Sequence, residues 1–548
     1  MLAALAFSAG AQPLLIHNAK VWTADPARPW AEAVLMDGDR IVAVGGNAEV
    51  AKRAAGAQRY DARGRLVIPG LNDAHLHFLS GSMGLSQVDL TGICTVPAMQ
   101  KAVADYAKAN PNKPWITGRG WEYYCFPNGR LPTRQDLDAV VSDRPVFLSA
   151  YDGHTGWANS KALERADINR ATRFEGYGEI VKDARTGQPT GALKEGAQAL
   201  VRKYIPAATR QEKLDALRRG LQLAAQLGLT SMQNAAGDEE ELSLYEELLK
   251  NGELTVRIAF ALSVPPGTAL ERADAIGKLK ARYRDPQLRV IGVKLMMDGV
   301  IENYTAAMLA PYADKPETSG SPAWTPEAFK QMVTRCDRNG LQVLTHAIGD
   351  RGIRLTLDGY EAAARTNGRR DSRHRIEHIE TIHPSELPRF AQLGVMPSMQ
   401  PIHADPDTIH IWSRCIGPER VKLAFPWGAL EKAGARLVFS SDWPASLSVN
   451  PLRGLHNAVN RRTIEGKPEG GWVPEQRVSL ETALRAYTTS AAYAEFQESA
   501  KGMIKAGMAA DLLILSQDLF AIKPIEIHRT SVVCNVFRGR IIYQAVTP

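Results

Sequence analysis

Short apolar runs that end in polar residues recur along the middle of the chain, and helical patterns separate them. The eight runs that we interpret as strands end at His77, Asn234, Ser263, Met297, His346, His378, Gln400 and Asp442. Apolar residues recur at helical spacing between these runs, as over residues 211–227, 326–339 and 351–365. Eight alternating strand–helix units predict an α/β fold, a (β/α)8 barrel of the TIM type.

The two ends of the chain have a different pattern, in which short alternating strands are joined by turns. Strand patterns cover residues 14–22 and 33–45 near the start, and 510–515 and 532–543 near the end. Asp37-Gly38 stands where a hairpin turn is expected. We therefore predict one small β-sandwich composed of residues 13–69 and 497–548, with the barrel formed by residues 70–496.

A segment after the first strand, about residues 92–200, does not follow the barrel rhythm. It is rich in Gly, Pro and aromatic residues, among them Trp115, Trp121, Trp157 and Tyr177. We interpret it as an insertion on the face where barrel loops form active sites. Its aromatic side chains either contact a substrate or form the core of the insertion itself, and the segment is alternatively a structural appendage.

The composition is that of a globular protein. Of the 548 residues, 45% are apolar and 23% charged, and the formal net charge is +7. Lys and Arg are scattered among the acidic residues, so nucleic-acid binding is not expected. No stretch beyond the N-terminus is long and apolar enough for a membrane span. The five cysteines are odd in number and lack Cys-x-x-Cys spacing, which argues against a disulfide framework or a thiolate metal site.

The first residues of the chain are small and apolar. Residues 1–12 end in Ser8-Ala9-Gly10-Ala11-Gln12, which resembles the last part of a secretory signal peptide. The positively charged start of such a signal is missing, so a frayed terminus is the alternative. We expect a periplasmic or secreted protein, and otherwise a cytoplasmic one.

Candidate chemistry lies at the ends of the predicted strands. His75 and His77 are two residues apart on a strand, so both imidazoles project to one face and can bind one metal ion. Lys294 lies on the fourth strand, and His346, His378 and Asp442 end the fifth, sixth and eighth. In a barrel all six side chains converge at the carboxyl-end mouth, where catalytic groups gather in this fold.

These stretches give the chain a specific resemblance. The matching stretches are Gly70-Leu71-Asn72-Asp73-Ala74-His75-Leu76-His77, Asp152 to Ser160, Val293 to Gly299, Thr345 to Asp350, Arg375-Ile376-Glu377-His378 and Ser440 to Pro444. The chain resembles the amidohydrolase superfamily, specifically amidohydrolase family 3, the group resembling N-substituted formamide deformylases. The resemblance implies a metal-dependent amidohydrolase that cleaves a non-peptide carbon–nitrogen bond in a small amide, formamide or cyclic amide.

The resemblance also implies roles for the six residues. His75, His77 and Asp442 would hold one divalent metal, His346 and His378 a second, and Lys294 would bridge them as a carbamate made with carbon dioxide. An ammonium beside two cations is repelled, whereas a carbamate supplies two anionic oxygens. Zinc suits these ligands best, with manganese or iron possible by geometry. Asp442 would be the general base for water. A single metal at His75, His77 and Asp442 is the alternative.

Further residues are candidates for substrate binding. They are His154 and Trp121 in the insertion and Asp298 just after Lys294, which alternatively orients ligands or backbone. His403 and His410 follow the seventh strand and either contact substrate or are exposed loop residues.

Other functions are compatible with the same residues. Deamination or ester hydrolysis could use the same metal site, and an inactive barrel could serve as a scaffold. A serine hydrolase is not favoured, because no Gly-x-Ser-x-Gly motif occurs. A homodimer is the default expectation for such an enzyme.

Overall fold

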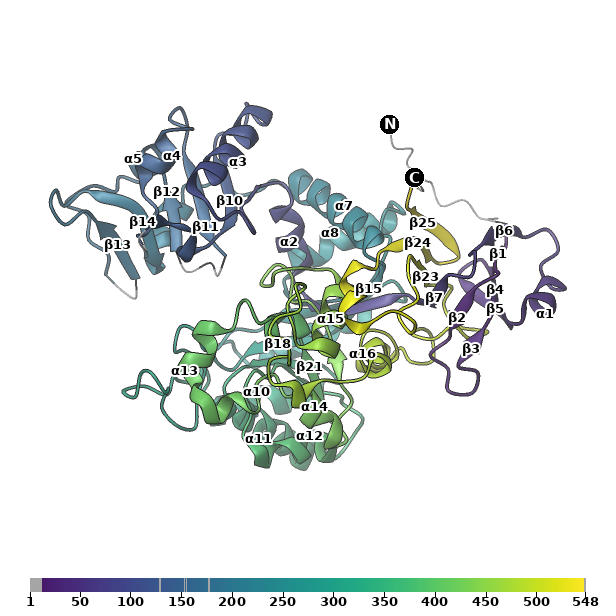
Figure 1. Ribbon diagram of the computed structural model, residues 1–548. Coiled ribbons are helices and arrows are strands. Elements are labelled where there is room, and N and C mark those ends of the chain that lie inside the picture. The colour runs from purple at the N-terminus through teal and green to yellow at the C-terminus, as the bar shows by residue number, and fades with distance from the viewer. Residues whose placement is uncertain (1–11, 128–129, 152, 154, 176–177, 547–548) are drawn as a thin grey trace. The chain divides into compact units, whose positions relative to one another are not determined.

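The computed structural model describes residues 12–127, 130–151, 153, 155–175 and 178–546 (Figure 1). The chain divides into two compact units, which are described separately below. One comprises Met1–His77 with Leu221–Pro548, and the other is Phe78–Gly220. The predicted signal-peptide remnant lies outside the described residues, except for Gln12. Among the described residues, every helix is too short or too polar to span a bilayer.

The larger unit contains a nearly closed barrel of eight parallel strands. They are β8 (Leu71–Leu76), β15 (Leu229–Gly237), β16 (Arg257–Ser263), β18 (Leu288–Met296), β19 (Gln342–Ala347), β20 (Arg375–His378), β21 (Met396–Met399) and β22 (Val438–Phe439), in sequence order around the sheet. Beyond β22, the amide of Asp442 donates to the carbonyl of His75, and that of His77 to Trp443. These bonds connect the last strand segment to the first, and the predicted TIM-type barrel is confirmed.

Helices connect successive barrel strands and follow the last one. Those between strands are α8 (Glu239–Lys250), α9 (Glu271–Arg282), α10 (Pro326–Arg338), α11 (Asp350–Asn367), α12 (Leu387–Leu393), α13 (His410–Val421) and α14 (Trp427–Lys432). Those after β22 are α15 (Pro451–Asn460), α16 (Leu480–Ala486) and α17 (Thr489–Ala494). Helix α10 shows why they form: Thr325 caps the amide of Ala328, and Pro326 occupies the first turn. One face of α10 then buries Phe329 and Met332. The apolar side of the helix thus covers the barrel wall.

Two smaller sheets contain the ends of the chain, the first built from N-terminal strands and the second from strands of both ends. One pairs β5 (Arg40–Gly45), β4 (Ala33–Asp37), β1 (Leu14–His17) and β6 (Gln58–Asp61), and the other β25 (Arg540–Gln544), β24 (Val532–Phe537), β23 (Leu512–Leu515), β7 (Leu66–Pro69), β2 (Lys20–Trp22) and β3 (Trp30–Ala31). Ile16 and Val34 share one buried cluster with Ile514 and Val536. The additional sheets built from both termini are therefore confirmed.

The path of the chain from this region into the barrel determines the position of β8, the strand that carries His75. Strand β7 leads through Gly70 directly into β8. A Cβ at Gly70 would lie 2.1 Å from Oγ1 of Thr230, so no side chain fits where the chain passes the next strand. This close passage brings β8 beside β15 and places His75 at the inner mouth of the barrel.

The smaller unit is the segment that follows β8, and its bounds are wider than the predicted 92–200. Its sheet has the order β13 (Gly178–Lys182), β14 (Pro189–Glu195), β12 (Thr155–Ala158), β11 (Val146–Ala150), β10 (Ile116–Trp121) and β9 (Val88–Asp89). Its helices include α2 (Phe78–Gly84), α3 (Val96–Ala109), α4 (Arg134–Asp138), α5 (Ser160–Arg165) and α6 (Ala199–Arg202), and α7 (Arg210–Gln226) runs across the boundary between the units.

Aromatic residues form the core of this smaller unit. Trp121, Phe126 and Trp157 pack edge to face with ring centroids 5.4–6.3 Å apart. Trp121 is fully buried, and its Nε1 donates to the carbonyl of Leu148. These three aromatic residues therefore form part of the core of the insertion, which was one of the two alternatives predicted from the sequence.

The structure corrects the prediction for the cysteines. Cys94 and Cys125 form a disulfide bond, whereas Cys336, Cys415 and Cys534 are free and buried, as expected of small apolar residues. The cysteine spacing had not predicted this single bond. The cause is tertiary: β9 pairs with β10, which brings together the segments that follow these strands.

Candidate metal centre

The predicted ligands lie at the carboxyl ends of the barrel strands. His75 is in β8, Lys294 in β18, His346 in β19 and His378 at the end of β20, and Asp442 follows β22. His378 and Asp442 have φ values of 77° and 60°, in the left-handed region that non-glycine residues seldom adopt. Such strain is concentrated at functional sites, where surrounding structure holds it in place.

Two imidazoles converge on Oδ1 of Asp442. Nε2 of His75 lies 3.4 Å and Nε2 of His77 3.3 Å from this oxygen. Nδ1 of His77 donates to the carbonyl of Ala235 at 2.8 Å, and Nδ1 of His75 to Oε2 of Glu377 at 2.6 Å. Because the Nδ1 atoms carry the protons, both Nε2 atoms present lone pairs.

The donor set fits a cation. Oδ1 of Asp442 is buried and has no hydrogen-bond donor among the described residues. Two imidazole lone pairs facing an unpaired carboxylate oxygen repel one another unless a positive charge lies between them. One ligand atom from each of His75, His378 and Asp442 also lies within 4.8 Å of the others. Imidazole nitrogen and carboxylate oxygen are ligands that zinc prefers.

His346 and His378 form the second half of the site. Their ring centroids are 4.5 Å apart, and that of His378 is 5.0 Å from His75. Nδ1 of His378 lies 2.8 Å from Oε1 of Gln400, whose amide donates to Ser440. Nε2 of His346 donates to the carbonyl of Gly299 at 3.1 Å. His378 therefore keeps the lone pair of Nε2, and His346 that of Nδ1, for a ligand.

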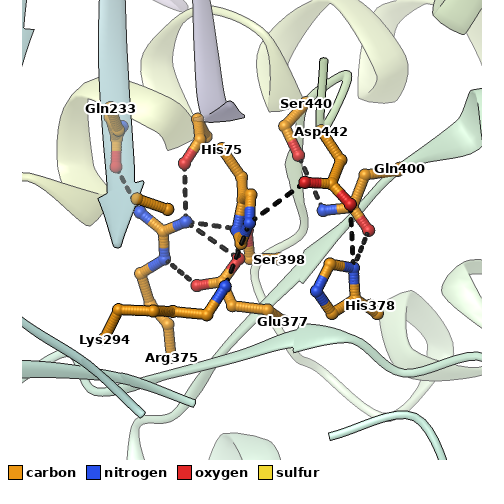
Figure 2. A network of polar contacts seen from close by, with 12 residues as sticks. His75, Gln233, Lys294, Arg375, Glu377, His378, Ser398, Gln400, Ser440 and Asp442 are labelled. Carbon is orange, nitrogen blue, oxygen red and sulfur yellow. Dashed lines mark hydrogen bonds and ion pairs between the residues drawn. The ribbon is translucent and has the colours of Figure 1, made fainter. Parts of the chain in front are cut away.

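Lys294 reaches the same cluster from β18. Its Nζ lies 3.1 Å from Nε2 of His75, the nitrogen that also faces Asp442 (Figure 2). The side chain is buried, and this burial lowers the pKa of the amine to about 8. The six predicted residues are thus brought to one end of the barrel in the larger unit.

A buried ion pair supports the first ligand. Arg375 and Glu377 are both fully buried on β20, and the guanidinium donates to the carboxylate through Nε at 2.8 Å and Nη2 at 3.1 Å. Arg375 also donates to the carbonyl of Ala74, to Ser398 and to Gln233 (Figure 2). The carboxylate of Glu377 in turn fixes the ring of His75, as acceptors beside metal-bound histidines commonly do.

The electrostatics keep the ligands in metal-binding form. Burial lowers the pKa of His346 to about 3 and that of His378 well below its usual value, so both imidazoles are neutral. Arg375 and His75, which both donate to Glu377, lower the pKa of its carboxyl against the effect of burial. Neutral imidazoles and ionised carboxylates are the states that bind metals.

Asp298 holds the backbone next to the site. Its carboxylate accepts hydrogen bonds from the amides of Ala307, Ile348 and Gly349 at 2.9–3.0 Å. Oδ1 also lies 3.7 Å from Nε2 of His346. Asp298 thus orients the backbone, which was the alternative to substrate binding predicted from the sequence. Direct contact of Asp298 with substrate stays a prediction.

The other candidates for substrate contact have different outcomes. His154 lies outside the described residues, so its contact with substrate stays a prediction. Trp121 is fully buried in the core of the smaller unit. His410 is exposed, as a loop histidine was expected to be. His403 is not: its side chain is only 16% exposed and lies beside Asp442.

Sequence reasoning missed the residues that support the ligands. These residues are Arg375, Glu377 and Gln400, which lie inside or next to predicted strands. Their polar side chains were not recognised as part of the site. A signal was present, because Arg375 and Glu377 are two charged residues inside a strand that must be buried on both faces in a barrel. Two opposite charges at that spacing point to one face and can pair.

A (β/α)8 barrel with four histidines, a lysine and an aspartate at the carboxyl ends of its strands defines a metal-dependent hydrolase. A profile described as "Amidohydrolase family" (Amidohydro_3) matches residues 58–543. The chain therefore belongs to amidohydrolase family 3, within the amidohydrolase superfamily.

Individual proteins are similar over nearly the whole chain. Protein LONG AFTER FAR-RED 3 of Arabidopsis thaliana is 33% identical over 517 residues, which cover 92% of this chain and 87% of that protein. N-substituted formamide deformylase of Arthrobacter pascens is 28% identical over 526 residues, covering 92% and 93%. The crystal structure of an uncharacterized metal-dependent hydrolase from Pyrococcus furiosus has a TM-score of 0.74 at 28% identity, covering 94% and 100%.

Proposed function

We propose that the protein hydrolyses a non-peptide carbon–nitrogen bond in a small amide, formamide or cyclic amide. The observation that carries the proposal is the convergence of His75 and His77 on the unpaired Oδ1 of Asp442. Similarity to the formamide deformylase of Arthrobacter pascens supports this choice of bond. The family, the barrel and the donor set together support hydrolysis over a scaffold role.

We propose two divalent ions, with zinc the best match to these ligands and manganese or iron also compatible. His75, His77 and Asp442 would hold one ion, His346 and His378 the other, and Lys294, carboxylated at Nζ, would bridge them. The position of Nζ 3.1 Å from Nε2 of His75 supports this role, because an unmodified ammonium there would be repelled by a bound cation. A single ion at His75, His77 and Asp442 is the alternative.

The residues of the chain divide the reaction between them. A bound divalent ion supplies Lewis-acid polarisation of the carbonyl and lowers the pKa of water. Asp442 takes the proton of the attacking water and passes it to the leaving nitrogen. Glu377 keeps the ring of His75 in place, and Asp298 keeps the loop after His346 in place. His154 stays a candidate for substrate contact.

A panel of N-formyl, N-acyl and cyclic amides, assayed with added zinc or manganese, tests the proposal. We expect turnover of at least one amide that is lost on exhaustive chelation and dialysis and returns with the metal. Turnover that survives complete metal removal would contradict a metal site and favour a serine-type mechanism. Turnover of esters or aminopurines alone would favour an esterase or a deaminase.

We also propose export to the periplasm or secretion. The Cys94–Cys125 disulfide supports this, because disulfides persist mainly in oxidising compartments. Cell fractionation of the tagged full-length protein tests it, and recovery in the cytoplasm with reduced cysteines would contradict it.

A further inference from the structure

A cavity lies at the amino end of the barrel, and its wall consists of residues of the larger unit. Its volume is about 320 Å³, which is within the usual range for pockets that bind small molecules. Arg436, in the wall, comes before β22, whereas Asp442 follows that strand, so the cavity and the predicted metal ligands are at opposite ends of the strand. The wall also includes Pro26, Arg485, Ser490, Glu498 and Met503.

Tyr493, on α17, holds the guanidinium of Arg436 in place. Cζ of Arg436 lies 3.9 Å from the centroid of the Tyr493 ring, and Cζ of Arg373 lies 3.5 Å from it. At these distances only one guanidinium fits over each face, so the ring lies between the two arginines. Arg373 is itself fixed by ion pairs with Asp371 at 2.7 Å and Glu498 at 2.8 Å. The stacked Arg436 is therefore pre-organised, which reduces the entropy that a ligand loses on binding.

The charge of Arg436 is not neutralised by another side chain. Within the described part of the chain, neither its guanidinium nor the hydroxyl of Ser490 has a hydrogen-bond or ion-pair partner. The acidic residue in the wall, Glu498, is occupied by the ion pair described above, in which both of its oxygens accept hydrogens. Arg485 is paired with Glu481 of its own helix at 2.8 Å. The wall thus presents unused N–H and O–H donors, together with a positive charge at Arg436.

The donors and the apolar part of the wall together define a class of ligand. A guanidinium offers a planar fork of N–H groups that matches the two oxygens of a carboxylate. Pro26 and Met503 provide apolar surface in the same cavity, which a purely inorganic anion would leave exposed to water.

We propose that this cavity is a second binding site, which takes a small organic carboxylate. The carboxylate binds Arg436 and Ser490, and the apolar part of the ligand packs on Pro26 and Met503. This site is separate from the metal centre, and the inference does not depend on the proposed function.

The test uses 4-iodobenzoate, which joins a carboxylate to an apolar ring, and 4-iodobenzyl alcohol, an uncharged counterpart. Anomalous scattering from iodine locates each probe in soaked crystals of the full-length protein, and calorimetric titration measures its Kd in solution. Titrations are run with the metal bound and after its removal, because a carboxylate also binds metal ions. The variants are Arg436→Gln and Arg436→Lys, which keeps the charge without the fork. Arg282→Gln is the matched control, an exposed arginine stacked on Tyr283.

We expect an iodine peak in the cavity and a Kd for 4-iodobenzoate that metal removal leaves unchanged. Arg436→Gln should raise this Kd about 10-fold or more, Arg436→Lys should raise it less, and Arg282→Gln should change it less than about 2-fold. Binding that is lost with the metal, equal binding of the alcohol, or wild-type binding by Arg436→Gln would overturn the proposal. So would a peak in crystals without binding in solution, or tighter binding of inorganic phosphate than of 4-iodobenzoate.

Discussion

The substitution Glu377→Gln tests how the protein holds its first metal ligand. Glu377 accepts the proton of His75 Nδ1 at 2.6 Å and two hydrogens of Arg375, and all three residues are fully buried. Glutamine has nearly the same volume, so the packing is retained and the charge is lost. His75 then has a neutral partner, which makes Nε2 a weaker ligand.

The expected effect is a metal affinity reduced about 10- to 100-fold, or about 1.4–2.7 kcal/mol. The same change leaves the buried guanidinium of Arg375 without a counter-ion, which costs about 3–5 kcal/mol of stability. Competition with a chromogenic zinc chelator measures the affinity, and denaturant unfolding of the metal-free protein measures the stability.

The matched control is Glu386→Gln. Glu386 is also a buried carboxylate paired with arginines, at 2.7 Å from Arg354 and 2.8 Å from Arg389, but it contacts none of the predicted ligands. We expect it to lower stability and leave metal affinity unchanged. The reasoning would be refuted if Glu377→Gln bound zinc as tightly as the wild type, or if both variants lost affinity equally.

Three further predictions concern the ligands themselves. Asp442→Asn should fold and yet lose at least about 10²-fold in kcat, since the general base is removed; full activity of the Asp442→Asn variant would contradict that role. Lys294→Ala should be inactive and regain activity with millimolar acetate or propionate if a carboxylate is needed at that position, and absence of rescue would argue against the carbamate. Burial lowers the pKa of His346 to about 3 and that of His378 well below its usual value. Below pH 6.5 the unfolded chain therefore binds more protons than the folded chain. The metal-free protein should then lose up to about 1.4 kcal/mol per pH unit for each imidazole as pH falls from 6.5 toward 3, and a flat profile of unfolding midpoints would contradict this.

The sequence was sufficient to predict the barrel fold and the residues that are its candidate metal ligands. Residues 258–263 and 437–442 are short apolar runs that end in polar residues, and the chain order of such runs matches their order in the sheet. The residues at the strand ends could be predicted because parallel strands of a barrel place their carboxyl ends at one mouth.

Features that depend on tertiary contacts could not be predicted in this way. Cys94 and Cys125 are 31 residues apart with no spacing signature, and only the pairing of β9 with β10 brings their segments together. His403 looked like an exposed loop histidine, because nothing in the local pattern shows that the 3₁₀ helix η5 (Pro401–Ala404) turns it toward Asp442. The aromatic residues of the insertion could not be assigned to core or substrate until Trp121 and Trp157 were seen to pack on each other.

Anomalous diffraction from crystals of active, zinc-loaded protein, collected on both sides of the zinc edge, tests the central claim most directly. We predict two peaks, one bounded by His75, His77 and Asp442 and one by His346 and His378, with carbamate density on Lys294 between them. A single peak at the first position would contradict the dinuclear centre. Fully active protein with no peak among these residues would contradict the metal site itself.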